Sequence, residues 1–300
     1  MRGSSNSAFC GTVSAVVVPQ KPTLMNNHLL FPEWQSYGED DRVSSGSRCI
    51  CSLFQEFEFD EVEIADTKPL SRRQGILGLD SIIQNLNSAC STLYQRRQKQ
   101  LLSIGGTCGS EFAPVSYLNH SYGGELAVVW MDAHGDLNTP DTSPSGHFHG
   151  MVLRSLVGEG EQKIIDLLSR PLLSKQLVLA GTRDLDPSEE RFISSQKIPL
   201  IKTEDLIDPE TLIDSITQTN APNVYVHLDL DVIDPSDFPY VVCPTPKGIR
   251  LEQLELILKG LNSSTNVVGL GIVECVSSNP DECRVITDLV KRSGITRRWS

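Results

Sequence analysis

Short apolar runs alternate with segments of helical periodicity along most of this chain, and this alternation constrains the fold more than any other feature. The runs at 126–131, 177–180 and 267–273 are apolar almost throughout. They lack the in-and-out alternation of a strand that faces water on one side. Such runs are typical of a parallel sheet that helices cover on both faces. The sequence therefore predicts an α/β fold with a mainly parallel sheet.

The expected elements follow one another closely. We expect strands at 12–18, 57–64, 101–104, 126–131, 177–180, 198–201, 224–230 and 267–273. We expect helices at 76–93, 110–118, 150–168, 209–216 and 251–261, and further ones that begin at Pro187 and Asp281. The polar stretch 20–47 is interpreted as a long surface loop. Because no repeat, low-complexity tract or linker interrupts the series, residues 1–300 are predicted to form one domain.

The net charge and the cysteine content indicate which binding partners and which cellular compartment to expect. The 300 residues carry a net charge of −12. This argues against binding to nucleic acid or an anionic membrane, since both need a basic surface, whereas a small cationic substrate is compatible. No apolar run reaches the roughly 18 residues of a membrane span. The eight cysteines include no CxxC pair, which favours free thiols and a cytoplasmic protein.

Polar side chains follow most of the expected strands. GGTCGSE follows 101–104, DAHGD follows 126–131, GTRDLD follows 177–180, HLDLDVIDP lies in and after 224–230, and ECVSSNP follows 267–273. In an open parallel sheet, ligands bind at the carboxyl ends of the strands. We therefore expect the functional site at this edge.

Two of these strand ends carry the residues that metals prefer. Asp132, His134 and Asp136 occupy alternate positions, so in an extended chain they share one side. If they meet Asp229 and Asp231, each pair of carboxylates repels by roughly 4 kcal/mol at about 4 Å and an effective dielectric near 20. Protons or metal must relieve this repulsion. Mixed carboxylate and imidazole ligation suits Mn, with Zn, Ni or Fe as alternatives, and the surplus of carboxylates favours two ions.

In combination, these segments carry a family resemblance. DAHGDLNTP, SGHFHG, RDLD, DLDVIDPS and VEC…NP resemble the signature segments of the arginase or ureohydrolase family (arginase, agmatinase, formiminoglutamase), in the same order through most of 101–280. The resemblance implies a three-layer α/β/α fold with a parallel, eight-stranded sheet and a centre of two Mn²⁺ ions. It also implies hydrolysis of guanidino or amidino C–N bonds, and it leaves a homo-oligomer open.

The resemblance implies a ligand set with one departure. Asp132 and Asp229 would bridge the metals, His134 and Asp231 would complete one site, and Asp136 would belong to the other. Cys108 stands where the family has the remaining histidine ligand. A thiolate there would ligate and favour softer ions such as Zn²⁺, whereas a protonated thiol would leave that site weak or empty.

His227 offers another ligand for the weakened site. It lies two residues before Asp229, so in a strand both side chains point to the same side. The imidazole could then reach the metal or orient a ligand. The alternative is a half-buried strand histidine with a hydrogen-bond partner.

On the substrate side, the resemblance makes His149 a proton shuttle and pairs Glu274 with the guanidinium. Small polar residues fall where arginases contact the amino-acid end of arginine, which favours an amino-acid-like substrate; for each of them a turn or cap role is the alternative. His147 replaces a usual Asn and Cys243 a usual Thr, so the pocket shape is expected to differ. The implied substrate-binding residues are Asn138, Ser143, Ser145, His147 and Asp186.

Three functions remain open at this point. In the first, a metal-bound hydroxide attacks the guanidino carbon, Asp136 accepts or orients its proton, and His149 protonates the leaving amine, which gives urea and an amine. In the second, a single metal held mainly by Asp132, His134 and Asp229 hydrolyses an amide or formimino bond. The third is a non-catalytic binding protein. The presence of Asp136, Glu274 and His149 together favours the first.

Overall fold

The computed structural model describes residues 27–95 and 99–299 of the chain. Within these ranges, eight strands form one sheet: β1 (His28–Phe31), β2 (Phe59–Glu61), β5 (Leu101–Gly105), β6 (Leu126–Met131), β7 (Leu177–Ala180), β8 (Leu200–Ile201), β9 (Asn223–Asp229) and β10 (Asn266–Val273). Their spatial order is β2-β1-β5-β10-β9-β6-β7-β8, and each pairing is parallel. The predicted parallel sheet is confirmed.

Helices connect the strands and cover the sheet. The α-helices are α1 (Arg42–Leu53), α2 (Leu79–Tyr94), α3 (Phe112–Ser121), α4 (Val152–Leu156), α5 (Gln162–Ile165), α6 (Pro187–Gln196), α7 (Glu210–Gln218), α8 (Leu251–Ser264) and α9 (Pro280–Ser293). Short 3₁₀ turns are η1 (Gln35–Tyr37), η2 (Cys108–Glu111), η3 (His149–Met151), η4 (Ser174–Gln176), η5 (Thr203–Asp205) and η6 (Leu230–Val232). A small antiparallel hairpin pairs β3 (Arg72–Arg73) with β4 (Ile76–Leu77).

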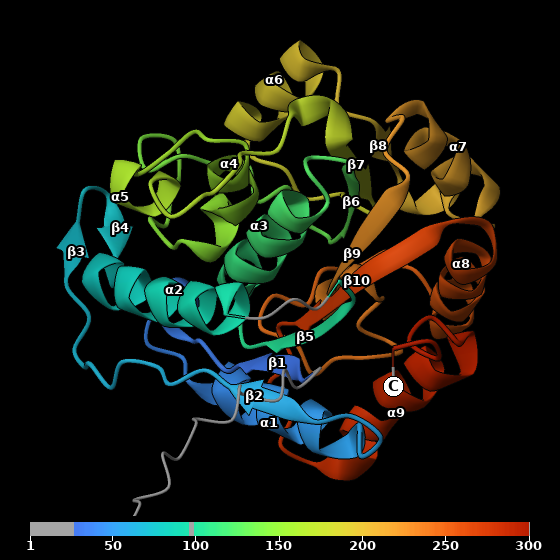
Figure 1. Ribbon diagram of the computed structural model, residues 1–300, viewed down its shortest axis with the longest axis horizontal. Helices are drawn as coiled ribbons and strands as arrows, with labels where there is room; N and C mark the ends of the chain where they lie inside the picture. The colour runs from blue at the N-terminus through green and yellow to red at the C-terminus, as the bar shows by residue number, and fades with distance from the viewer. Residues whose placement is uncertain (1–26, 96–98, 300) are drawn as a thin grey trace, which may run out of the picture.

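Two hydrophobic clusters, one on each face of the sheet, give the three-layer α/β/α arrangement. Successive strand residues point to opposite faces. On β6, Val129 therefore joins the cluster built with α1, α7, α8 and α9, whereas Val128 and Trp130 join the cluster built with α2, α3, α4 and α6. Figure 1 shows these two groups of helices on either side of the central strands β9 and β10. Buried strands with apolar residues on both faces explain the continuous apolar runs in the sequence.

The structure corrects one expectation and adjusts two others. The described part of the expected loop 20–47 instead contains β1, η1 and the start of α1, because a strand as short as His28–Phe31, ended by Pro32, gives little periodic signal. The expected helix 150–168 is divided into α4 and α5, with Gly158 at a positive φ between them. The expected strand 57–64 is confirmed only at Phe59–Glu61. The strand expected at 12–18 lies outside the described residues.

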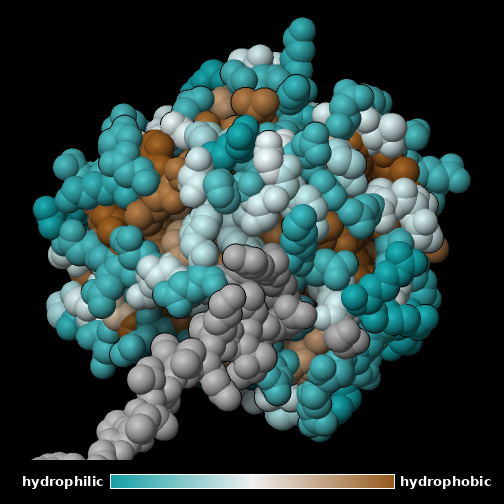
Figure 2. Space-filling view, in the orientation of Figure 1, coloured by the Kyte–Doolittle hydropathy of each residue, from teal (hydrophilic) through white to brown (hydrophobic). Residues whose placement is uncertain are grey.

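Hydrophilic side chains dominate the face seen in Figure 2, and the hydrophobic groups on it are divided into separate patches. The large apolar side chains that are exposed are scattered over different elements: Leu173, Ile207, Leu256 and Val285. Scattered exposed apolar residues are ordinary on protein surfaces. No helix in the described ranges has the length and hydropathy needed to cross a membrane.

Candidate active site

The predicted site residues converge at the carboxyl ends of the central strands. Asp132 directly follows β6, Asp229 is the last residue of β9, and Glu274 directly follows β10. Cys108 begins η2, just after β5. Because these four strands are parallel neighbours or near neighbours in the sheet, their carboxyl ends meet at one edge. The sheet topology therefore assembles side chains that lie far apart in the sequence.

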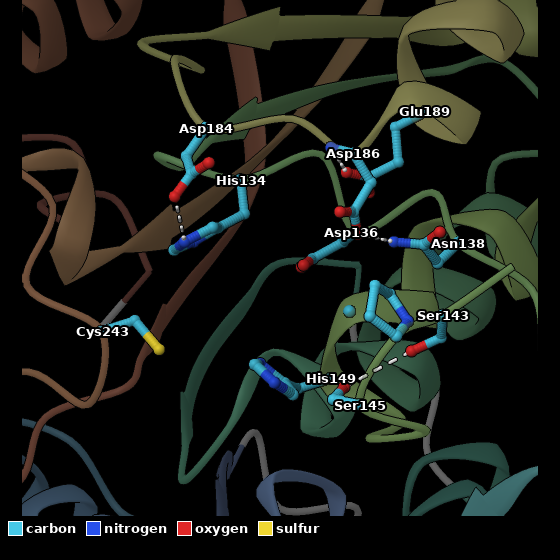
Figure 3. A pocket seen from close by; sticks show the side chains of 12 residues that line it. His134, Asp136, Asn138, Ser143, Ser145, His149, Asp184, Asp186, Glu189 and Cys243 are labelled. Atoms are coloured by element: carbon cyan, nitrogen blue, oxygen red, sulfur yellow. Dashed lines mark hydrogen bonds and ion pairs between the residues drawn. The ribbon is translucent and has the colours of Figure 1, made fainter.

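A pocket of about 250 Å³ opens at this edge. Figure 3 shows His134 and Asp184 on one side of it, Asp136 near its centre, and His149 across from them. It contains most of the predicted substrate residues but not His147, whose ring lies 5.6 Å from that of Tyr37 instead. The pocket is lined by His134, Asp136, Asn138, Ser143, Pro144, Ser145, His149, Gly150, Asp184, Asp186, Glu189 and Cys243.

One group of potential metal ligands consists of Asp132, His134 and Asp231. Nδ1 of His134 lies 2.9 Å from Oδ2 of Asp231 and 3.4 Å from Oδ1 of Asp132. Backbone donors fix the carboxylates, since the amide of His134 donates to Asp132 and the amide of Ala133 donates to Asp231. The ligand atoms are therefore held toward a common point before any ion binds.

A second group shares Asp132 with the first and adds Cys108, Asp136 and His227. The thiol of Cys108 donates to Oδ2 of Asp229 at 2.9 Å, and the indole Nε1 of Trp130 donates to Asp132 and Asp136 at 3.1 and 3.3 Å. One carboxylate, that of Asp132, therefore takes part in both groups.

A third group consists of Cys108, Asp229 and Glu274. Oε1 of Glu274 accepts a hydrogen bond from the backbone amide of Cys108 at 2.8 Å. Its other oxygen, Oε2, is buried and has no hydrogen-bond partner among the described residues. A buried carboxylate oxygen without a partner is costly unless a ligand completes its coordination.

The electrostatics of the site favour a bound cation. Burial, together with the neighbouring carboxylates, raises the pKa of Asp136 and Asp229 well above the ordinary value. The same causes raise the pKa of Asp231 and bring that of Glu274 to about 8. Burial acts in the same direction on Asp132, but the imidazoles of His134 and His227 lower its pKa. Without added positive charge, this cluster holds protons that divalent ions would displace. The donor set therefore fits metal.

His149 lies beside Glu274 in the site. Its Nδ1 lies 3.8 Å from Oε1 of Glu274, and its ring packs edge-on against Tyr37 with centroids 5.0 Å apart. Burial, helped by the nearby positive charge of His134, lowers the pKa of His149 to about 3. The imidazole is therefore neutral near pH 7, with one nitrogen able to accept a proton and the other able to release one.

Two residues of the site have left-handed backbone conformations that non-glycine residues rarely adopt. The φ angles are 53° at Asp136 and 68° at Glu274. Each such conformation costs of the order of 1 kcal/mol or more and persists where the surrounding structure enforces it. Here it occurs at two predicted catalytic residues, which indicates that the fold holds both carboxylates in set positions.

The wall of the pocket carries paired polar groups. The amide Nδ2 of Asn138 donates to Oδ2 of Asp186 at 2.8 Å, and the hydroxyls of Ser143 and Ser145 lie 3.4 Å apart. Both pairs appear in Figure 3 on the side of the pocket away from Cys243. Four of the five predicted substrate residues are therefore brought together on one wall.

Three carboxylates near the site were not identified from the sequence. Glu189 accepts hydrogen bonds from the amides of Leu137 and Asp186, so it fixes the loop after β6. Asp184 lies 4.0 Å from Nε2 of His134. Glu111 is fully buried, and its Oε2 lies 3.5 Å from Nδ1 of His227. For Glu189, the capping pattern formed with Asp186 at the start of α6 was a usable sequence signal.

Comparisons with known proteins agree with this geometry. A model of the arginase family matches residues 42–291. The arginase of Staphylococcus aureus (strain MRSA252) is 34% identical over 214 residues, which cover 68% of this chain and 70% of the relative.

Solved structures show the same fold. The Entamoeba histolytica arginase in complex with L-ornithine superimposes with a TM-score of 0.80 at 22% identity, covering 89% of this chain and 97% of the other. The formimidoylglutamase of Bacillus subtilis subsp. subtilis str. 168 gives a TM-score of 0.66 at 17% identity, covering 89% and 86%. The sequence matches and the clustered motif residues lead to one conclusion: this chain belongs to the arginase family, whose members hydrolyse carbon–nitrogen bonds other than peptide bonds.

Proposed function

We propose that this protein hydrolyses a guanidino C–N bond in a small amino-acid-like substrate related to arginine, with two divalent ions, of which Mn²⁺ is the first candidate. The observation that carries the proposal is a single pocket that combines potential metal ligands with a polar wall. His134 and Asp136 line the same cavity as Asn138 and Asp186. Because the potential metal ligands and the polar wall face the same cavity, both can act on one small molecule.

The metal ions would be held by the two ligand groups that share Asp132. When bound, they would supply positive charge that activates water and stabilises negative charge in the transition state. Hard oxygen donors dominate the set, which suits Mn²⁺ better than a softer ion. Asp136, with its carboxylate fixed by Trp130, would orient the attacking water or accept its proton.

Glu274 would bind the guanidinium. Glu274 belongs to the third ligand group, and its oxygen Oε2 is buried with no hydrogen-bond partner among the described residues. A guanidinium there would gain a charge-assisted hydrogen bond. The same contact would favour the ionised carboxylate against its pKa of about 8. His149, whose Nδ1 lies 3.8 Å from this carboxylate, would pass a proton to the leaving amine.

The polar wall would bind the amino-acid end of the substrate. Asp186 offers a carboxylate for an α-amino group, and the hydroxyls of Ser143 and Ser145 can donate to an α-carboxylate. The relative of similar fold that was solved with L-ornithine carries a ligand with both groups. Cys243 lines the opposite side of the pocket. Because arginases usually have Thr at this position, the pocket shape there is expected to differ from theirs.

A second candidate is a one-ion amide or formimino hydrolase. Cys108 favours it, because the thiol donates to Asp229 and burial, then the carboxylates around it, raise the pKa of Cys108 well above its ordinary value. A protonated thiol is a weak ligand. This candidate requires that no other side chain replace the missing histidine.

The substrate class is tested by assaying Mn²⁺-loaded protein with arginine and with agmatine, which lacks the α-carboxylate. We expect urea release with arginine at a kcat/KM at least tenfold above that with agmatine. Substitution of Ser143 and Ser145 by Ala should raise the KM for arginine and leave the KM for agmatine nearly unchanged, because agmatine keeps the amino group but lacks the carboxylate that these hydroxyls would bind. Equal use of the two compounds, unaffected by the Ser143→Ala and Ser145→Ala substitutions, would exclude the amino-acid-like substrate.

A further inference from the structure

His227 is a fully buried histidine on β9 whose ring nitrogens have no hydrogen-bond partner among the described residues. It is paired in register with Trp130 on β6, and the two rings are stacked with centroids 3.5 Å apart and planes within 9°. The packing therefore fixes the plane of the imidazole. A buried ring with two unpaired nitrogens is costly unless a ligand or partner completes it.

The nitrogen Nε2 faces the proposed metal centre. It lies 3.7 Å from Oδ2 of Asp132. A ring nitrogen of His227 forms one group with ligand atoms of Cys108, Asp132 and Asp136, and these atoms all lie within 4.8 Å of one another. An ion coordinated at about 2.1 Å can lie among such atoms after small side-chain shifts. The imidazole of His227 is therefore close enough to act as the nitrogen ligand in place of the family histidine, whose position Cys108 occupies.

The nitrogen Nδ1 faces a carboxylate on its other side. Oε2 of Glu111 lies 3.5 Å from Nδ1 and accepts a hydrogen bond of 2.6 Å from the hydroxyl of Tyr225. Room for this carboxylate depends on Gly271, where a Cβ would lie 1.7 Å from Oε2. A histidine held between a carboxylate and a metal is the arrangement that fixes the tautomer and orientation of metal-binding imidazoles.

Cys108 is less suited to the same role. Its Sγ lies 2.9 Å from Oδ2 of Asp229, within hydrogen-bonding distance of that carboxylate. As a thiolate it would add a negative charge to a centre that already contains the carboxylates of Asp132, Asp136, Asp229, Asp231 and Glu274. A neutral imidazole ligates without adding negative charge.

We propose that His227, rather than Cys108, supplies the nitrogen ligand of the ion that Asp132 and Asp136 hold, and that Glu111 positions its ring. This assignment rests on the proposed two-ion centre. This assignment gives a role to the two His227 nitrogens that make no hydrogen bond among the described residues and to the buried Glu111 beside Nδ1. It also supplies a nitrogen ligand where Cys108 replaces the family histidine.

Metal counting on purified protein tests the assignment. Wild-type protein dialysed against Mn²⁺ should hold two ions per chain, H227F one, and C108A two. Phenylalanine keeps a flat ring against Trp130 but removes both nitrogens. H120F is the matched control, because His120 is exposed on α3, and should hold two ions. E111Q, which keeps an acceptor for Tyr225, should bind the second ion about 10- to 100-fold more weakly.

Cobalt substitution gives a readout that does not depend on the stability of a variant. The Co²⁺ form of the wild-type protein should show no thiolate-to-cobalt charge-transfer absorption. A strong absorption that disappears in C108A, or two ions retained by H227F, would overturn the assignment and leave the two-ion centre standing. Wild-type protein that binds no Mn²⁺ or Co²⁺ would overturn the centre itself, and with it the assignment.

Discussion

The Sγ atom of Cys108 lies 2.9 Å from Oδ2 of Asp229, so a thiol on the loop after β5 contacts a carboxylate at the end of β9. The two strands, β5 and β9, lie on either side of β10 in the sheet. The thiol therefore lies among the potential metal ligands, in two of the three groups. The number and kind of ions that this centre can bind therefore depend on which of these side chains act as ligands.

Asn substitutions should separate the two metal sites. Asp132 belongs to two of the three ligand groups, whereas Asp231 belongs only to the group with His134. We expect D132N to lose both ions and D231N to lose one, because an amide is a neutral and weaker ligand than a carboxylate. Metal analysis after dialysis measures both counts, with D80N, at an exposed ion pair with Arg73, as the control. Equal losses in D132N and D231N would contradict the shared position of Asp132.

Removing the His149 imidazole should slow turnover more than it weakens binding. The neutral ring lies 3.8 Å from Glu274 and can relay a proton to the leaving amine. H149A is expected to reduce kcat by roughly 10² to 10⁴, the usual contribution of general acid–base groups, with the metal content unchanged. Steady-state assays of H149A, with H120A as the control, measure the effect on kcat and KM. A change confined to KM would mean that His149 only contacts the substrate.

The metal-free protein should lose stability as the pH rises from 6.5 to 8. Burial raises the pKa of Glu189 to about 7 and that of Glu274 to about 8, from 4.5. A carboxyl whose pKa is raised on folding stabilises the folded state at low pH, and this contribution is lost as the pH passes the folded value. The lowered pKa of His149 acts in the opposite direction only below 6.5, its ordinary value.

Each protonated carboxyl changes the free energy of unfolding by up to about 1.4 kcal/mol per pH unit. Mn²⁺ should reverse the trend, because ion binding requires deprotonated ligands and strengthens as the pH rises. Denaturant titrations at pH 6.5 and 8, with EDTA or with Mn²⁺, measure both slopes. Metal-free protein that is equally stable at the two pH values would show that these carboxyls are not protonated in the folded state.

Gly46 is expected to tolerate no side chain. It lies in α1, and a Cβ there would stand 1.9 Å from the backbone oxygen of Cys275, directly after Glu274. G46A should lower the free energy of unfolding by about 1 to 3 kcal/mol through this overpacking, despite the higher helix propensity of alanine. S45A is the control, since Ser45 is exposed on the same helix. Equal stability of G46A and S45A would mean that α1 can shift freely.

The fold was largely predictable because the central strands are buried on both faces. The expected strands 126–131 and 177–180 match β6 and β7 at both ends. β1 was missed because its apolar signal is short. The sequence also carries no direct signal of strand order, so the adjacency of β9 and β6, which stacks His227 on Trp130, had to come from the structure.

The site was predictable where ligands lie close in the chain and less so where they come from different strands. Asp132, His134 and Asp136 were found from their alternate spacing. The contact of Glu111 with His227 could not be found this way, because 3.5 Å between their side chains depends on how η2 packs behind β9. Gly271, which makes room for Glu111, is on yet another strand.

Urea release from L-arginine by Mn²⁺-loaded protein, measured beside D132N, tests the central claim most directly. We expect urea formation that requires Mn²⁺, stops on chelation and is absent in D132N, because Asp132 belongs to two of the three ligand groups. Wild-type protein with two bound Mn²⁺ ions that releases no urea from arginine or any other guanidino compound would contradict the proposed function.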